Sequence, residues 1–185
     1  MKKASCFALV LLATAALAQE AKSSAGSTSN PVSDTVRNMI GNQAQNLTAA
    51  AEEMPADKYG YKPTEQQMTF GTLVEHTIKS NNFLCAKLTS QAAPAEKLSD
   101  KDPKDKLVAQ LKGSFDYCET ALKGVQDSQL GEPVTLFGGR QANKAAALIG
   151  LTNGWADHYG MAATYLRLNG MLPPTAKKTQ TAAKE

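Results

Sequence analysis

Two histidines, His76 and His158, are the side chains of this sequence best suited to holding a metal ion or moving a proton. No other histidine is present, and both lie on or beside the apolar face of a segment with helical spacing. Two interpretations are open. Each histidine is a partly buried side chain that hydrogen-bonds a neighbour, or the two are ligands that face each other across a helical bundle.

A catalytic zinc site generally needs a third protein ligand, and the neighbours of His158 offer none. Side chains four positions apart share a helix face, but the residues four before and four after His158 are Gly154 and an alanine. Met161 lies three positions on, and its thioether prefers Cu(I) to zinc. A carboxylate from another helix, Asp116 or Glu119, is the remaining candidate.

Motifs of other catalytic and binding classes are absent from the sequence. It contains no Gly-x-Ser-x-Gly elbow, no phosphate loop and no dinucleotide fingerprint. Lysines alternate with acidic residues, as in 101–106, whereas a phosphate-binding surface needs clustered lysine and arginine. We therefore expect no nucleic-acid partner.

The beginning of the chain predicts export. Two lysines precede a short apolar run that ends in the small-x-small triplet 16–18, so residues 1–18 are expected to be a signal peptide. The run is shorter than the roughly 20 apolar residues that cross a bilayer, and we expect no stable membrane anchor. The mature chain is expected to begin at Gln19 and to be periplasmic or secreted.

Export makes Cys85 and Cys118, the cysteines of the mature chain, a candidate disulfide. An even pair in an oxidising compartment favours a structural bridge over free thiols, and the Cys-x-x-Cys spacing of a redox pair is absent. The bridge would close a loop of about 30 residues, which the chain-entropy model credits with about 3 to 4 kcal/mol. A cysteine–histidine pair stays open, because spacing alone does not place Cys118 against either histidine.

The apolar spacing predicts an all-α, four-helix bundle in a single domain, residues 31–174. The chain has 185 residues, of which 42% are hydrophobic, enough for one core. The helices are expected to run up and down, joined by long loops, at 31–54, from Thr69 or Thr72 onward, from Pro103 onward, and at 142–169.

Local signals mark the helix ends and the flanking segments. The second helix is predicted to open with a capping box between Thr72 and Glu75, and the third with Asp102 as its cap. Residues 19–30 and 175–185 are small, polar and aperiodic, and we expect a flexible leader and a disordered tail.

The segments 157–161 and 165–174 resemble the C-terminal signature of the DinB/YfiT-like superfamily. The segments 55–63 and 69–76 are similar to that family's first loop and second helix. The resemblance implies a four-helix bundle, often dimeric, that holds a divalent metal such as zinc, nickel or manganese. It also implies one histidine ligand on the second helix and a His-x-x-x-His pair on the fourth. Members include thiol-dependent transferases and related metal-dependent enzymes.

Carried onto this chain, the resemblance assigns His76 to the first ligand and His158 to the last, while the middle ligand falls on Gly154. The first functional hypothesis is therefore an exported DinB-like bundle with a degenerate divalent-metal site and a binding or structural role toward an unknown small molecule or protein. The alternative is a metal-dependent hydrolase or thiol transferase that uses His76 and His158. The resemblance further implies a homodimer assembled through the first and fourth helices. The sequence does not decide whether the protein is an enzyme.

Overall fold

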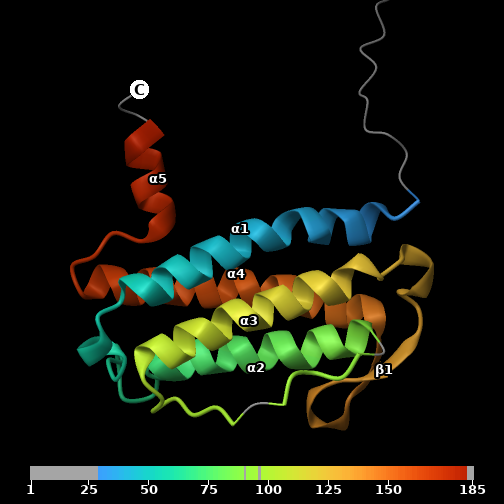
Figure 1. The fold of residues 1–185 in the computed structure, drawn as a ribbon, viewed down its shortest axis with the longest axis horizontal. Helices are drawn as coiled ribbons and strands as arrows, with labels where there is room; N and C mark the ends of the chain where they lie inside the picture. Colours follow the sequence, from blue (N-terminus) through green and yellow to red (C-terminus); the bar gives the residue numbers. More distant parts are fainter. Residues whose placement is uncertain (1–28, 90, 96, 183–185) are drawn as a thin grey trace, which may run out of the picture.

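Four long helices lie side by side in the computed structural model, which describes residues 29–89, 91–95 and 97–182 (Figure 1). The predicted signal peptide and nearly all of the predicted leader lie outside the described residues. The bundle helices are α1 (Pro31–Glu53), α2 (Phe70–Leu88), α3 (Lys104–Lys123) and α4 (Lys144–Leu168), and a short helix α5 (Pro174–Ala182) follows. The prediction of an all-α bundle is confirmed.

Short elements fill the long loops. Three single 3-10 turns are η1 (Ala56–Lys58), η2 (Asp127–Gln129) and η3 (Phe137–Gly139). Strands β1 (Pro133–Thr135) and β2 (Gln141–Asn143) pair antiparallel on either side of η3, with Val134 opposite Ala142. The apolar run before the fourth helix thus forms one arm of a small hairpin.

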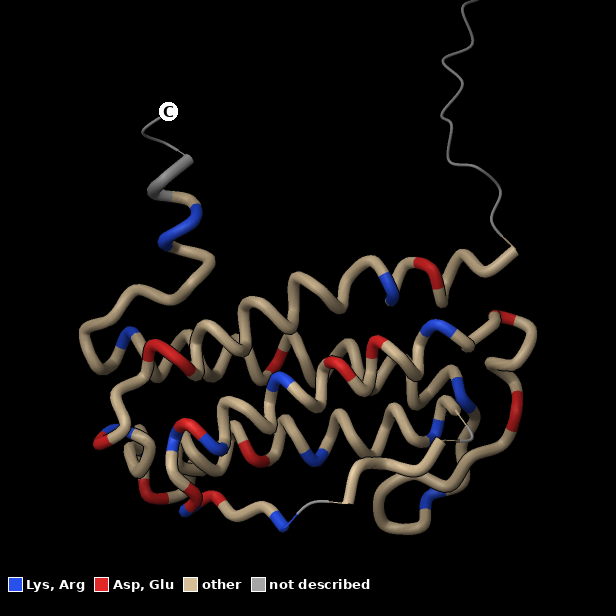
Figure 2. The backbone as a smooth tube through the Cα atoms, in the orientation of Figure 1, with Lys and Arg blue, Asp and Glu red and all other residues tan. Residues whose placement is uncertain are grey.

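The core lies between the helices, where α2 packs against α3 and α4, and α1 covers the other side of the same two helices. Its largest fully buried side chains include Trp155, Tyr165, Phe70, Phe115 and Met54. None of the helices in the part of the chain that the structure describes is long and apolar enough to span a membrane. Basic and acidic residues alternate over the bundle without gathering on one face (Figure 2).

Two predicted helix caps differ from the observed ones. The helix α2 is capped by Thr69, whose hydroxyl accepts from the Thr72 amide at 3.1 Å, while Glu75 pairs with Lys79 instead of closing a capping box. Asp102 does not cap α3, because its carboxylate accepts from the Ser99 amide within the preceding turn. Both predictions were wrong because the expected capping side chain binds another nearby group: Glu75 binds Lys79, and Asp102 binds the Ser99 amide.

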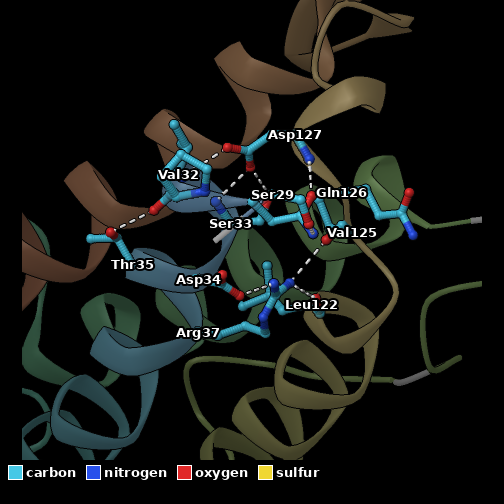
Figure 3. Close-up of polar contacts among 12 residues, drawn as sticks. Ser29, Val32, Ser33, Asp34, Thr35, Arg37, Leu122, Val125, Gln126 and Asp127 are labelled. Atoms are coloured by element: carbon cyan, nitrogen blue, oxygen red, sulfur yellow. Dashed lines mark hydrogen bonds and ion pairs between the residues drawn. The ribbon is translucent and has the colours of Figure 1, made fainter. Parts of the chain in front are cut away.

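The N-terminus of α1 is capped by a residue far away in the chain, as Figure 3 shows. The carboxylate of Asp127 accepts from the amides of Val32 at 2.9 Å and Ser33 at 2.8 Å, and from the Ser33 hydroxyl at 2.6 Å. In return, the Asn30 side chain accepts from the Asp127 amide at 2.8 Å. Free amides and the helix dipole both favour a negative charge at this position. The loop after α3 is thereby tied to the start of α1.

The helical spacing of α1 predicts an inner face made of Val32, Val36, Met39, Ile40, Leu47 and Ala50. Val36, Ile40, Leu47 and Ala50 are buried as expected, whereas Val32 and Met39 are exposed. Ser33 is buried in addition, and its amide and hydroxyl both donate to Asp127.

We expect Asp127→Ala to lower the urea midpoint of unfolding at pH 7 and to expose the first-turn amides of α1 to hydrogen exchange. Removal from water raises the pKa of Asp127, but the hydrogen bonds from Ser33 and Val32 lower it by more, so its net pKa lies below the usual range. Its stabilisation is therefore complete above the ordinary aspartate pKa of about 3.9 and is lost as the pH falls through the lower folded value.

The difference in urea midpoint between the parent protein and Asp127→Ala should accordingly be large at pH 7 and small at pH 3. Asp116→Ala, at an exposed position of α3, is the control and should leave the midpoint close to that of the parent. An equal decrease in the urea midpoint of both variants at pH 7 would contradict the capping role of Asp127.

The end of the chain differs from the expected disordered tail over residues 174–182, which form α5. Pro174 stands at its first position, where its fixed φ suits a helix start. Lys177 pairs with Glu53 at 2.9 Å, and Lys178 donates to Gln45 at 2.7 Å. The prediction failed because these partners lie on α1, which a local polar composition does not reveal. Before it, α4 ends at Leu168, one residue short of the predicted end at 169, and Gly170 follows with a φ of +76°.

Candidate functional site

A cavity of about 260 Å³ lies between α2, α4 and the loop that joins the two strands. The polar part of its lining includes His76, Asn81, Arg140, Trp155 and His158. Leu84, Leu136, Phe137 and Leu151 are among its apolar side chains. A concave, mostly apolar space with a few convergent polar groups is typical of a small-molecule site.

The structure brings the two predicted histidines together in this cavity. The ring centroids of His76 and His158 are 5.0 Å apart, and the rings are inclined by 74° in an edge-to-face arrangement. Their surroundings differ, because His158 is 6% exposed whereas His76 is exposed to solvent. Helical phase accounts for both positions, since His158 lies within the buried face of α4 and His76 lies beside the buried face of α2.

The hydrogen bonds around His158 decide which of its ring nitrogens carries the proton. The hydroxyl of Thr77 donates to the Leu73 carbonyl at 2.8 Å, so its oxygen accepts from His158 Nδ1, 3.2 Å away. The lone pair of the neutral ring is then on Nε2, which has no hydrogen-bond partner among the described residues. This is the tautomer that a histidine needs to accept a proton or to ligate through Nε2.

Burial lowers the pKa of His158 below the ordinary histidine value, and the neighbouring His76 lowers it further, whereas Asp157 raises it. His158 is therefore neutral at pH 7 and acts at the cavity wall as a hydrogen-bond acceptor.

The donor set does not fit the three-ligand metal site that the family resemblance implies. Gly154 lies one turn before His158, and a Cβ placed on it would be 3.7 Å from the Cε1 atom of that ring. The glycine thus occupies the place of the middle ligand and offers no donor. Across residues 29–89, 91–95 and 97–182, no group of three histidine, cysteine, aspartate or glutamate side chains could hold a metal ion.

The carboxylates and the thioether considered from the sequence lie elsewhere. Asp116 and Glu119 line surface grooves between α3 and α1, on the other side of the bundle from the histidine pair. Met161 lines a separate groove near Gln67. None of them is brought to the histidines.

A buried hydrogen-bond network holds the indole of Trp155 against the cavity. The indole N–H of Trp155 donates to Asn81 Oδ1 at 2.8 Å, and Asn81 Nδ2 donates to the Ser114 hydroxyl at 3.1 Å. That hydroxyl donates to the Leu111 carbonyl at 2.7 Å. Asn81 is not among the predicted site residues, although a polar residue within the apolar stripe of a helix is the signal that could have identified it.

We expect Asn81→Leu to lower the free energy of unfolding by about 2 kcal/mol, because it leaves the buried indole N–H of Trp155 without an acceptor. Urea denaturation measures the effect. Asn82→Leu is the matched control on the same helix, since Asn82 Oδ1 is buried and has no hydrogen-bond partner in the described structure. We expect Asn82→Leu to leave the free energy of unfolding nearly unchanged. An equal decrease in both variants would contradict a stabilising role of the hydrogen-bond network.

The loop between the strands lies against α2 at the edge of the cavity. Phe137 stacks on Phe83 with ring centroids 3.9 Å apart, and the Lys87 ammonium lies 4.9 Å from the Phe83 ring. Gly138 and Gly139 have φ of +67° and +80°, values that favour glycine, and they let the loop turn back on itself. Arg140 follows directly and lines the cavity. A lone arginine in a loop carries no periodic signal, so Arg140 was not predictable as a site residue.

The structure pairs Cys85 with Cys118 in a disulfide that joins α2 to α3, with their Cα atoms 5.3 Å apart. Both cysteines are fully buried. A disulfide sulfur is not a thiolate, so this arrangement offers no cysteine–histidine nucleophile.

Comparison with known proteins agrees with this architecture. The family model of the DinB superfamily matches residues 40–162. No curated protein sequence matches the chain. Among solved structures, a DinB-like protein from Bacillus subtilis is similar, with 22% identity and a TM-score of 0.60 over 74% of this chain and 92% of that one.

Two further structures share the fold at lower identity. One is a variant of a mycothiol-dependent maleylpyruvate isomerase, with 11% identity and a TM-score of 0.56 over 69% of this chain and 59% of that one. The other is a conserved protein from Enterococcus faecalis, with 12% identity and a TM-score of 0.55 over 72% and 94% of the two chains. At these identities the likeness concerns the fold.

Proposed function

The chain belongs to the DinB superfamily, and from that premise we propose that it is an exported binding module with a degenerate metal site, which takes a small molecule into the cavity between α2 and α4. The observation that carries the proposal is Gly154. It stands where the resemblance implies a ligand, in a cavity that still has two histidines and an apolar wall.

Two imidazoles form an incomplete ligand set for a divalent ion, because a protein site for catalytic zinc generally has three side-chain ligands. A cavity without a bound ion can instead receive an organic ligand on the same polar groups. The neutral His158 supplies an acceptor there and the exposed His76 a second polar group.

Metal content tests this proposal directly. Mature protein without a tag is dialysed against zinc, manganese or nickel, then against metal-free buffer, and is analysed by mass spectrometry. We expect well under one ion per chain, and a melting temperature that a chelator leaves unchanged. Near-stoichiometric metal that resists dialysis would overturn the degenerate site.

The second candidate is a metal-dependent hydrolase or thiol transferase, and the proximity of the His76 and His158 rings favours it. Stoichiometric metal in the same experiment would select this candidate. His76→Ala and His158→Ala would then lose the ion, whereas the first proposal expects only the ordinary cost of a core change, about 1 to 3 kcal/mol, at the buried His158.

Export and self-association complete the proposal. The signal-like sequence 1–18 supports a periplasmic or secreted protein, and sequencing the N-terminus of the exported product should give Gln19. Exposed apolar side chains on α1 (Val32, Met39) and α4 (Ile149, Leu168) support a homodimer through these helices. Sedimentation of only a monomer at micromolar concentration would count against the dimer.

A further inference from the structure

We infer that the ligand of the cavity is a small organic monocarboxylate with an apolar body, whose carboxylate pairs with Arg140. The inference rests on the proposed function and specifies the chemical class of the molecule bound at that site. It follows from the charge, the lining and the size of the cavity together.

Arg140 is a permanent cation in the lining of the cavity, and none of the described residues that line it is an aspartate or a glutamate. The Arg140 side chain is exposed and has no ion pair or hydrogen-bond partner among the described residues. An arginine guanidinium presents a planar set of donors that matches a carboxylate in a bidentate pair. The free guanidinium at the rim is therefore the group that selects an anion.

The lining offers no second permanent cation beside Arg140, because none of the described residues that line the cavity is a lysine or another arginine. His158 directs its Nδ1 toward the Thr77 hydroxyl, 3.2 Å away, so that proton is not available to a ligand in the cavity. A doubly charged ligand such as a phosphate monoester would leave one charge against an apolar wall, which is costly. One arginine and an apolar lining favour a monoanion.

The rest of the cavity suits a hydrocarbon or aromatic body. Leu84, Leu136 and Leu151 form its apolar wall together with Phe137 and Trp155. On α4, Gly150 and Gly154 lie four positions apart and both line the cavity, so these two positions contribute no side chain that would fill it. A volume of about 260 Å³ equals that of roughly nine water molecules at about 30 Å³ each, which suits a ligand of about ten non-hydrogen atoms.

The test compares two probes that differ in charge and hardly in shape, 3-phenylpropanoate and 3-phenylpropanamide. Trp155 is the only tryptophan of the chain and lines the cavity, so its fluorescence reports binding, and calorimetry provides a second readout. We expect the acid to bind at least about tenfold more tightly than the amide, in line with the strength of charge-assisted pairs.

Three variants show which residues produce the preference for the acid over the amide. Arg140→Gln should reduce the affinity for the acid to that for the amide and leave the amide unchanged. Arg167→Gln removes the same charge from an exposed position of α4 outside the cavity, and should change neither affinity. Gly154→Leu should block both probes by filling the cavity, with circular dichroism to verify that the variant is folded.

Equal affinity for the two probes, or a preference that survives Arg140→Gln, would overturn the carboxylate inference while a binding cavity remained. Absence of binding by either probe would also overturn it. The proposed degenerate metal site is judged separately by metal content, so the two failures are distinguishable.

Discussion

Gly154→His is expected to bind zinc at least about a hundredfold more tightly than the parent protein. The substitution adds a third imidazole one helical turn before His158, and neighbours four positions apart lie on the same helix face. Three protein ligands form the usual catalytic zinc set, and even the loss of a supporting hydrogen bond around such a site costs 10- to 100-fold, so a missing ligand costs at least as much.

The surroundings of position 154 can accept the new side chain. A Cβ there meets its nearest atom, Cε1 of His158, at 3.7 Å, an ordinary van der Waals contact, and the cavity lies beyond. The ring of His158 is already oriented for ligation, because its Nδ1 donates to Thr77 and its Nε2 is left without a partner among the described residues. Metal-bound histidines commonly have such a second hydrogen bond.

Competition with a chromophoric chelator measures the zinc affinity, and the rise in melting temperature on adding zinc gives an independent reading. Gly150→His is the matched control, because Gly150 lines the same cavity two turns from His158 and cannot complete the set with it. A similar increase in zinc affinity for both variants, or no increase for Gly154→His, would show that His76 and His158 do not bind one ion together.

Replacing both Cys85 and Cys118 with alanine is expected to lower the free energy of unfolding by about 3 to 4 kcal/mol. The bridge joins residues 33 positions apart, and it restricts the unfolded chain far more than it alters the folded one. Such a loss is a large part of the 5 to 15 kcal/mol that typical domains possess.

Urea denaturation of the mature protein with and without a reductant provides the measurement. The reductant should bring the parent protein close to the stability of the double variant and should not affect the variant. Thiol titration of the denatured parent should find no free cysteine. Two titratable thiols, or a parent protein insensitive to reductant, would contradict the bridge in the mature protein.

Some features of the cavity followed directly from the order of residues along the chain. Helical phase placed His158 on the apolar face of its helix and His76 beside that of its own, because a period of 3.6 residues assigns each position to a side of the helix. Gly154 was predictable as the residue one turn from His158, since that relation lies within a single helix. The apolar stripes of the helices were predictable for the same reason.

Features that join distant segments were not predictable in this way. Asp127 caps α1 and Lys177 pairs with α1, and both partners are remote in the chain. Arg140 reaches the cavity only because the strand pair and the stacking of Phe137 on Phe83 hold its loop there. No local pattern encodes such a contact.

The sequence by itself determined an all-α bundle, its apolar helix faces, the two histidines near those faces and the missing ligand at Gly154. These follow from local periodicity and residue type, which act within one helix at a time. The tertiary structure decided that the rings of His76 and His158 lie 5.0 Å apart, that the cavity beside them has an apolar wall, and that Arg140 stands unpaired at its edge. Those relations depend on how α2, α4 and the strand loop pack together, because packing fixes the rotation and depth of each element against the others.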